Sequence, residues 1–220
     1  MTRPLLLGHR GARAFKAIPE NTLPSFDRAL ADGCDGFEFD VRLAADRRAI
    51  ICHDPVFKDA RAKTEKLHIA RCASDRLPAL PSLEDVLARY PSAFLDIELK
   101  VRGTEEVVVT ELEKHRPKRF VVSSFLPGVL QTLHSLDSEL PLGLICETKT
   151  QLARWKKLPV LYVIPHRKIA RRDLIQEMHD SNLQVLVWTV NRAQEMERFA
   201  AWEVDGVISD DTKLLATTLG

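Results

Sequence analysis

The sequence of 220 residues lacks several features that would mark a secreted, membrane or nucleic-acid-binding protein. No apolar run approaches the roughly 20 residues of a membrane-spanning helix, and the apolar stretch near the N-terminus is too short for a secretory signal. Because 32 lysines and arginines face 31 aspartates and glutamates, no global field attracts nucleic acid or an anionic membrane. We therefore expect a cytoplasmic protein with no nucleic-acid partner and no stable membrane association.

Cysteine is scarce, and the usual nucleotide-binding loops are missing. The four cysteines, Cys34, Cys52, Cys72 and Cys146, form no CxxC pair, and Cys34 and Cys52 lie in or beside predicted strands. We therefore expect buried reduced thiols and not a disulfide framework or a zinc site. Neither GxGxxG nor GxxxxGKS/T follows the first predicted strand, which removes the usual marker of a nucleotide-binding open sheet.

Short apolar runs alternate with helical patterns along the whole chain, and no linker interrupts them. The eight main predicted strands begin at Leu5, Asp35, Ala93, Arg119, Leu140, Val160, Gln184 and Gly206. Helices are predicted between them, for example over residues 21–31 and 151–158, and a further extended piece over residues 49–53. Eight units of about 27 residues suit a minimal closed barrel. The sequence therefore predicts a single α/β domain, 1–220, folded as a (β/α)8 TIM barrel with a short insertion at about 55–80.

Carboxylates follow the alternation of two neighbouring predicted strands. Glu38 and Asp40 share one face of the second strand, and Asp96, Glu98 and Lys100 share one face of the third. Side chains at the C-terminal ends of barrel strands form the active sites of this fold, and neighbouring buried carboxylates are costly without a cation. The pattern predicts a cation site, although Glu38 and Asp40 alone also fit an exposed edge of a strand, and Glu98 and Lys100 alone also fit a structural ion pair.

Two histidines accompany these carboxylates at predicted strand ends. His9 follows the first strand, and the extended piece after the second strand ends in His53 and Asp54. Taken alone, His9 is as compatible with a structural role as with a catalytic one. His166 ends the sixth predicted strand, where it either enters the site or begins the next helix. The combination at several strand ends favours an active site.

The ordered set of motifs resembles the glycerophosphodiester phosphodiesterase family over nearly the whole chain. The motifs are His9-Arg10-Gly11, Pro19-Glu20-Asn21-Thr22, Glu38-Phe39-Asp40-Val41, His53-Asp54, Ile97-Glu98-Leu99-Lys100, Ser123-Ser124-Phe125 and Trp188-Thr189-Val190-Asn191. The resemblance implies a barrel that hydrolyses glycerophosphodiesters to an alcohol and glycerol 3-phosphate.

The resemblance also implies a metal and an acid–base pair. Glu38, Asp40 and Glu98 look like the ligands of one divalent cation, and an all-oxygen set suits Mg²⁺ or Ca²⁺. His9 and His53 are similar to the catalytic pair of the family. Which histidine acts as the acid, and whether water or a substrate hydroxyl attacks, stays open.

Further residues match positions around the substrate. Arg10 resembles a phosphate contact, Lys100 a substrate or phosphate contact, and Trp188 the aromatic wall near the glycerol. Glu20 and Asn21 look like groups that fix the loop behind the first histidine.

The chain departs from the family pattern at two places. Asp46 and Arg47 stand where the turn is usually Asp-Gly, and the insertion at about 55–80 lacks the usual Arg-Thr-Thr-like run. The second departure leaves substrate choice open. The alternatives are a lysophospholipase D-like or sphingomyelinase D-like phosphodiesterase, a metal-dependent barrel isomerase or amidohydrolase with a histidine on the metal, and an inactive binding module.

Overall fold

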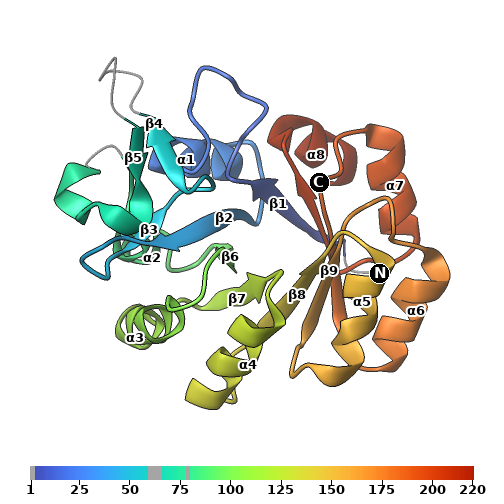
Figure 1. Cartoon of the computed structure of the whole chain (residues 1–220). Coiled ribbons are helices and arrows are strands. Elements are labelled where there is room, and N and C mark those ends of the chain that lie inside the picture. Colours follow the sequence, from blue (N-terminus) through green and yellow to red (C-terminus); the bar gives the residue numbers. More distant parts are fainter. Residues whose placement is uncertain (1–2, 59–65, 78–79) are drawn as a thin grey trace.

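The predicted barrel is confirmed by the computed structural model, which describes residues 3–58, 66–77 and 80–220. In the described part, eight parallel strands follow one another around the barrel: β1 (Leu5–His9), β2 (Gly36–Leu43), β6 (Phe94–Leu99), β7 (Arg119–Ser124), β8 (Leu142–Cys146), β9 (Tyr162–Pro165), β10 (Gln184–Val187) and β11 (Gly206–Ser209) (Figure 1). β11 pairs with β1, with Leu5 opposite Gly206, which closes the circle. Each strand begins within two residues of its predicted start.

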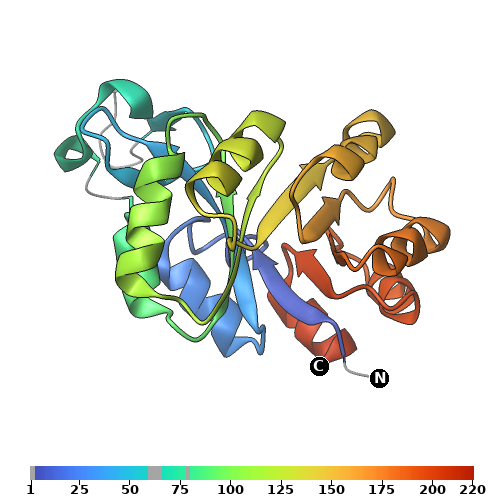
Figure 2. The ribbon, with the colours of Figure 1, turned by 90° about the horizontal axis from the view of Figure 1, so that it is seen from below.

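Helices cover the outside of the barrel, as Figure 2 shows. The described residues include α1 (Leu23–Ala31), α2 (Leu83–Arg89), α3 (Glu105–His115), α4 (Pro127–Leu136), α5 (Lys149–Leu152), α6 (Arg172–Asp180), α7 (Ala193–Ala201) and α8 (Thr212–Leu219). The helix predicted over residues 151–158 differs: it begins earlier, as α5, and continues as the 3-10 segment η3 (Ala153–Lys157). Thr148 caps its start, and Leu158 is extended because Pro159 follows it.

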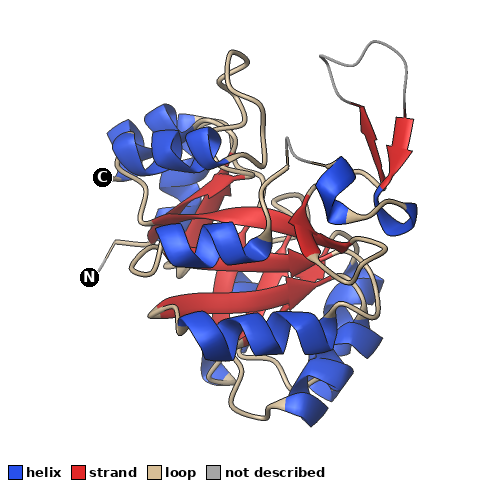
Figure 3. Cartoon of the chain, turned by 90° about the vertical axis from the view of Figure 1, so that its left-hand side faces the viewer, coloured by secondary structure: helices blue, strands red, loops and turns tan. Residues whose placement is uncertain are grey.

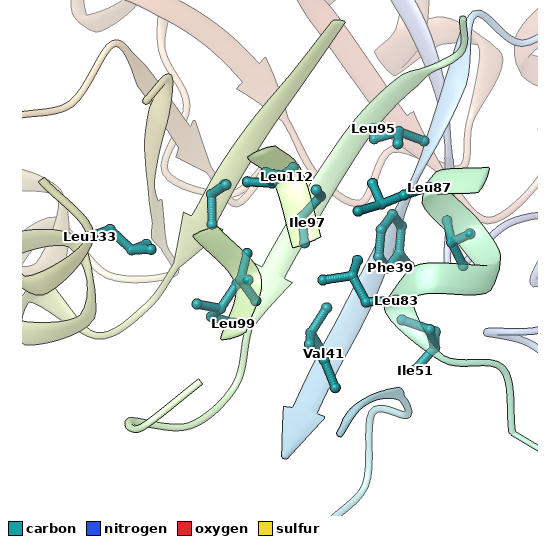
Figure 4. Packing of buried hydrophobic residues seen from close by; sticks show 14 of the residues in the cluster. Phe39, Val41, Ile51, Leu83, Leu87, Leu95, Ile97, Leu99, Leu112 and Leu133 are labelled. Carbon is teal, nitrogen blue, oxygen red and sulfur yellow. The ribbon is translucent and has the colours of Figure 1, made fainter. Parts of the chain in front are cut away.

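The alternation along β2 and β6 separates an apolar outer face from a polar inner one. Phe39, Val41 and Ile97 are fully buried and pack with Leu83 and Leu112 from the helices (Figure 4). Since successive side chains of a strand point to opposite faces, the carboxylates between these residues point into the barrel. The packing of the outer face therefore fixes the direction of the acidic residues.

The insertion forms a small hairpin beside the barrel. β3 (Ala49–Ile51), predicted as an extended piece, runs antiparallel to β2. β4 (Val56–Lys58) and β5 (Lys66–His68) pair antiparallel, followed by the 3-10 segments η1 (Ile69–Arg71) and η2 (Ser74–Arg76). Figure 3 shows the hairpin projecting at the end of the barrel toward which the strand arrows point. The hairpin therefore rises from the end that carries the candidate site.

The antiparallel return of β3 brings the chain back to the end of β2. The Cys52 backbone N–H donates to the Asp40 carbonyl at 2.9 Å. This contact places the next residue, His53, beside the carboxylates. Within residues 3–58, 66–77 and 80–220, none of the helices has the length and apolar character required to cross a bilayer.

Candidate active site

A pocket opens at the C-terminal ends of the barrel strands. Its walls are His9, Arg10, Glu38, His53, Asp96, Glu98, Lys100, Phe125, Ile145, Ile164, Trp188 and Ile208. One side is therefore charged and the other is apolar. The strand-end positions that carried the sequence prediction converge here.

Three carboxylates from β2 and β6 meet at the charged side of the pocket. Glu38, Asp40 and Glu98 each place one oxygen within 4.8 Å of the other two. Their residues are 4%, 0% and 7% exposed. The strand register produces this meeting, because Asp40 lies opposite Glu98 in the parallel pair.

The crowding changes the acidity of these groups in different directions. Burial and the charges of Asp40 and Glu98 raise the pKa of Glu38 well above its ordinary value. Burial and the Asp40 charge raise the pKa of Glu98 to about 7. Burial alone would also raise the pKa of Asp40, but Arg10 and Lys100 outweigh it, and the pKa of Asp40 is lowered. The pocket thus holds more carboxylates than the charges of Arg10 and Lys100 can neutralise.

The carboxylates fit a hard divalent cation. Glu38 Oε1 and Asp40 Oδ1 are buried and accept no hydrogen bond from the described residues. Buried acceptors without donors are costly, and carboxylate oxygens are the ligands that Mg²⁺ and Ca²⁺ prefer. The donor set of Glu38, Asp40 and Glu98 therefore suits such an ion.

Asn21 holds Asp40 from behind. The Asn21 side-chain amide donates to Asp40 Oδ2 at 2.7 Å, and the Asp40 backbone N–H donates to Asn21 Oδ1 at 3.3 Å. Asn21 has a φ of 56°, a left-handed conformation that asparagine tolerates better than most residues. Its own backbone N–H donates to the Arg10 carbonyl at 3.0 Å. Asn21 thus ties the carboxylate site to the loop after β1.

Two histidines face the same pocket from different surroundings. His9 Nδ1 lies 2.7 Å from Asp210 Oδ1, and His9 Nε2 lies 3.8 Å from Glu38 Oε2. His53 Nδ1 lies 2.8 Å from Asp54 Oδ1. The His9 side chain is 11% exposed and that of His53 is 36% exposed. Burial lowers the pKa of His53, which favours a neutral ring.

The two cations of the pocket are engaged with carboxylates. Arg10 donates from Nη1 to Glu20 Oε1 at 2.7 Å, and its Nε lies 3.2 Å from Asp40 Oδ2. Lys100 Nζ donates to Glu98 Oε1 at 2.6 Å and lies 3.3 Å from Asp40 Oδ1. Burial alone would lower the pKa of Lys100, but Glu98 and Asp40 outweigh it and raise that pKa. Both side chains therefore stay charged.

Trp188 stands on the apolar side of the pocket. Its indole N–H donates to the Ile164 carbonyl at 3.0 Å, and its ring meets Phe125 edge-on at 5.6 Å. His166 contacts the Trp188 ring at 5.1 Å but does not line the pocket in the described part of the chain. The position of Trp188 fits the predicted aromatic wall, and His166 supports that wall.

Two polar residues near the carboxylates and His9 had no assigned role: sequence reasoning placed Asp96 on the acidic face of its strand without a function of its own, and it did not select Asp210. Asp96 lines the pocket, accepts a hydrogen bond from Ser123 Oγ at 2.5 Å, and has its pKa raised by burial to about 7. Asp210 contacts His9. It directly follows β11, so the strand-end rule that selected the other residues would also have selected Asp210.

A second acidic group lies between α2 and α3, away from the pocket. Glu84, Glu111 and His115 bring ligand atoms within 4.8 Å of one another. Glu84 already accepts a hydrogen bond from Lys114 Nζ at 2.6 Å, and all three residues are only partly buried. This group provides a control in tests of cation binding.

Comparison with known proteins agrees with the fold and with the sequence motifs. A glycerophosphodiester phosphodiesterase of Caldanaerobacter subterraneus is 26% identical over 237 residues, which cover 97% of this chain and 96% of that protein. Among solved structures, a glycerophosphodiester phosphodiesterase of Thermotoga maritima superposes with a TM-score of 0.85 at 23% identity and covers 99% of both chains. A phosphodiesterase of Oleispira antarctica, solved with the product sn-glycerol-3-phosphate, gives 0.85 at 23% identity, covering 98% of this chain and 96% of its own.

The fold, the pocket and these likenesses define a TIM-barrel hydrolase of phosphoric diesters. The model of the glycerophosphoryl diester phosphodiesterase family matches residues 9–214. The chain therefore belongs to this family.

Proposed function

We propose that this protein hydrolyses glycerophosphodiesters to an alcohol and glycerol 3-phosphate, with one divalent cation, Mg²⁺ or Ca²⁺, held by Glu38, Asp40 and Glu98. The observation that carries the proposal is the convergence of these three buried carboxylates beside His9 and His53. Family membership and the named activity of the relatives support the substrate class. A cytoplasmic location stays part of the prediction, and cell fractionation would test it.

The proposed reaction gives each charged residue a distinct part. A bound divalent cation would neutralise and orient the phosphate. Arg10 and Lys100, both charged and both on the pocket wall, would hold its non-bridging oxygens. One of His9 and His53 would take the proton of the attacking hydroxyl, and the other would protonate the departing alkoxide. Both rings reach the pocket, so either can face the scissile bond.

The apolar side of the pocket would receive the organic part of the substrate. Phe125, Ile164 and Trp188 supply apolar surface to the same pocket as the carboxylates, and the rings of Phe125 and Trp188 contact each other. Such a surface shapes the space around the reacting ester and limits the water that enters it. Glu20 and Asn21 would act from behind this arrangement, because they hold Arg10 and Asp40 in place.

A panel of glycerophosphodiesters with different head groups tests the proposal. Each substrate is incubated with Mg²⁺, with Ca²⁺ and with excess EDTA, and glycerol 3-phosphate is measured. The expected result is turnover with a cation, none with EDTA, and none in Glu98→Gln. Glu111→Gln, in the partly exposed second acidic group, is the matched control and should behave like the wild type. Full turnover after exhaustive chelation would contradict the role of the metal.

Two further experiments distinguish the alternative substrates and the alternative attacking groups. Lysophosphatidylcholine beside glycerophosphocholine distinguishes a lysophospholipase D-like enzyme, which would prefer the acylated substrate. Reaction in ¹⁸O-labelled water, with NMR detection of any cyclic phosphate, distinguishes attack by water from attack by a substrate hydroxyl. A metal-dependent isomerase or amidohydrolase would place a histidine on the metal. The contact of His9 Nδ1 with Asp210 argues against that role for this nitrogen.

A further inference from the structure

Asp210, directly after β11, makes the closest contact to the His9 ring. Asp210 Oδ1 lies 2.7 Å from His9 Nδ1. The opposite nitrogen, His9 Nε2, faces the carboxylates and lies 3.8 Å from Glu38 Oε2. The contact joins the two ends of the chain, since closure of the barrel pairs β1 with β11. One ring nitrogen is thus held from behind while the other faces the pocket.

The carboxylate of Asp210 is ionised, so the direction of this hydrogen bond follows. Burial alone would raise the pKa of Asp210, but the contact with His9, the amide of Asn191 and the charge of Arg13 outweigh it and lower that pKa. An ionised carboxylate only accepts hydrogen bonds. His9 Nδ1 must therefore donate, so that whenever the ring is neutral the lone pair lies on Nε2, the nitrogen on the pocket side.

Asp210 is itself held on several sides. The Asn191 amide donates to Asp210 Oδ2 at 2.6 Å, and the Asp210 backbone N–H donates to Asn191 Oδ1 at 2.9 Å. Arg13 Nη1 donates to Asp210 Oδ1 at 3.2 Å, and Arg13 Nε donates to Glu20 Oε2 at 2.6 Å. Because Glu20 also accepts from Arg10, the same network supports the phosphate contact. The partner of His53 is less constrained, since the side chain of Asp54 is 73% exposed.

We propose that Asp210 is the positioning residue of His9, which fixes the ring so that Nδ1 keeps its hydrogen and Nε2 addresses the substrate. The inference rests on the proposed function for its kinetic consequence, and on the contacts and the charge of Asp210 for the state of the ring. Asp210 would act only through His9. It has no proton to transfer and does not line the pocket among the described residues.

Asp210→Asn tests the proposal with little change in shape. An amide at this position either accepts more weakly or turns a donor toward Nδ1, which favours the opposite tautomer. We expect kcat to fall at least about 100-fold and KM to change by less than about threefold. The ring nitrogens of His9 should give the ¹⁵N NMR pattern of an Nδ1–H tautomer in the wild type, and that pattern should be lost in the variant. His9→Gln assigns the signals.

Asp211→Ala is the matched control. Asp211 is the next residue and caps α8 by accepting from the Leu214 backbone N–H at 2.9 Å. Its loss should lower Tm by about 3 °C without changing kcat or the His9 signals. Unchanged His9 signals in Asp210→Asn, or a kcat within about threefold of the wild type, would overturn the inference. If the wild type cleaves no glycerophosphodiester, the proposed function fails, and the NMR comparison still decides whether Asp210 positions His9.

Discussion

Glu98→Gln should make the metal-free protein more stable while it removes activity. Glutamine has nearly the shape of the protonated acid and carries no charge. It can still accept a hydrogen bond from Lys100, which donates to Glu98 Oε1 in the wild type. The substitution therefore removes one buried charge beside Asp40 and little else. Activity would be lost because a proposed metal ligand is gone.

The size and sign of the effect follow from the pKa of Glu98. That pKa is raised from 4.5 to about 7 in the folded protein. Because the pKa of Glu98 is higher in the folded than in the unfolded protein, the free energy of unfolding is highest at pH values below the unfolded pKa of 4.5. This stability is lost as the pH rises through the folded pKa of about 7. The rise of this pKa from 4.5 to about 7 corresponds to about 3 kcal/mol. The metal-free variant and wild type should have similar free energies of unfolding near pH 4, and near pH 8 the variant should exceed the wild type by about 3 kcal/mol.

Urea unfolding with excess EDTA, repeated from acidic to alkaline pH, measures this difference. Addition of Ca²⁺ or Mg²⁺ should reverse the order, because a cation that binds only the folded wild type stabilises it. Glu111→Gln, outside the pocket, should follow the wild type under both conditions. A difference that does not change with pH, or equal stabilisation of Glu98→Gln and wild type by the cation, would refute the assignment of Glu98 as a crowded metal ligand.

Three further substitutions separate the other parts of the site. His53→Ala should lower kcat at least about 100-fold while Tm and cation affinity by calorimetry stay unchanged, because the ring is partly exposed; wild-type turnover would remove His53 from proton transfer. Asn21→Ala leaves Asp40 without two hydrogen bonds and should cost about 1–3 kcal/mol in urea unfolding, with weaker cation binding; wild-type stability would contradict this support. Trp188→Ala should raise KM about tenfold with a smaller change in kcat; an unchanged KM would exclude Trp188 from substrate binding.

The alternation of side chains made the barrel and its acidic side predictable. In β2, two phenylalanines alternate with Glu38 and Asp40, and this order fixes the face of each residue once one face packs against helices. The position of Asp40 opposite Glu98 then follows from the parallel register. The remaining assumption was that β2 and β6 are neighbours in the sheet. The eight alternating strand–helix units predicted a barrel in which they are.

The contact between His9 and Asp210 was not predicted, although the predicted closed barrel already places the last strand beside the first. Closure alone does not show which side chains at two neighbouring strand ends form a hydrogen bond. The hairpin of β4 and β5 was missed for a different reason. Each of its strands has three residues, too few to display an alternation. Side-chain contacts between strand ends and very short strands thus limited the prediction.

The balance of charge in the pocket connects the proposed cation with the proposed phosphate contacts. Arg10 and Lys100 both approach Asp40, and this explains why Asp40 keeps a low pKa while Glu38 and Glu98 do not. A divalent ion among the three carboxylates would neutralise them more fully than the single charges of Arg10 and Lys100 at the edge of the cluster. The carboxylates would then attract Arg10 and Lys100 less strongly. The same cations would become available to a phosphate, so binding of the ion and of the substrate should reinforce each other.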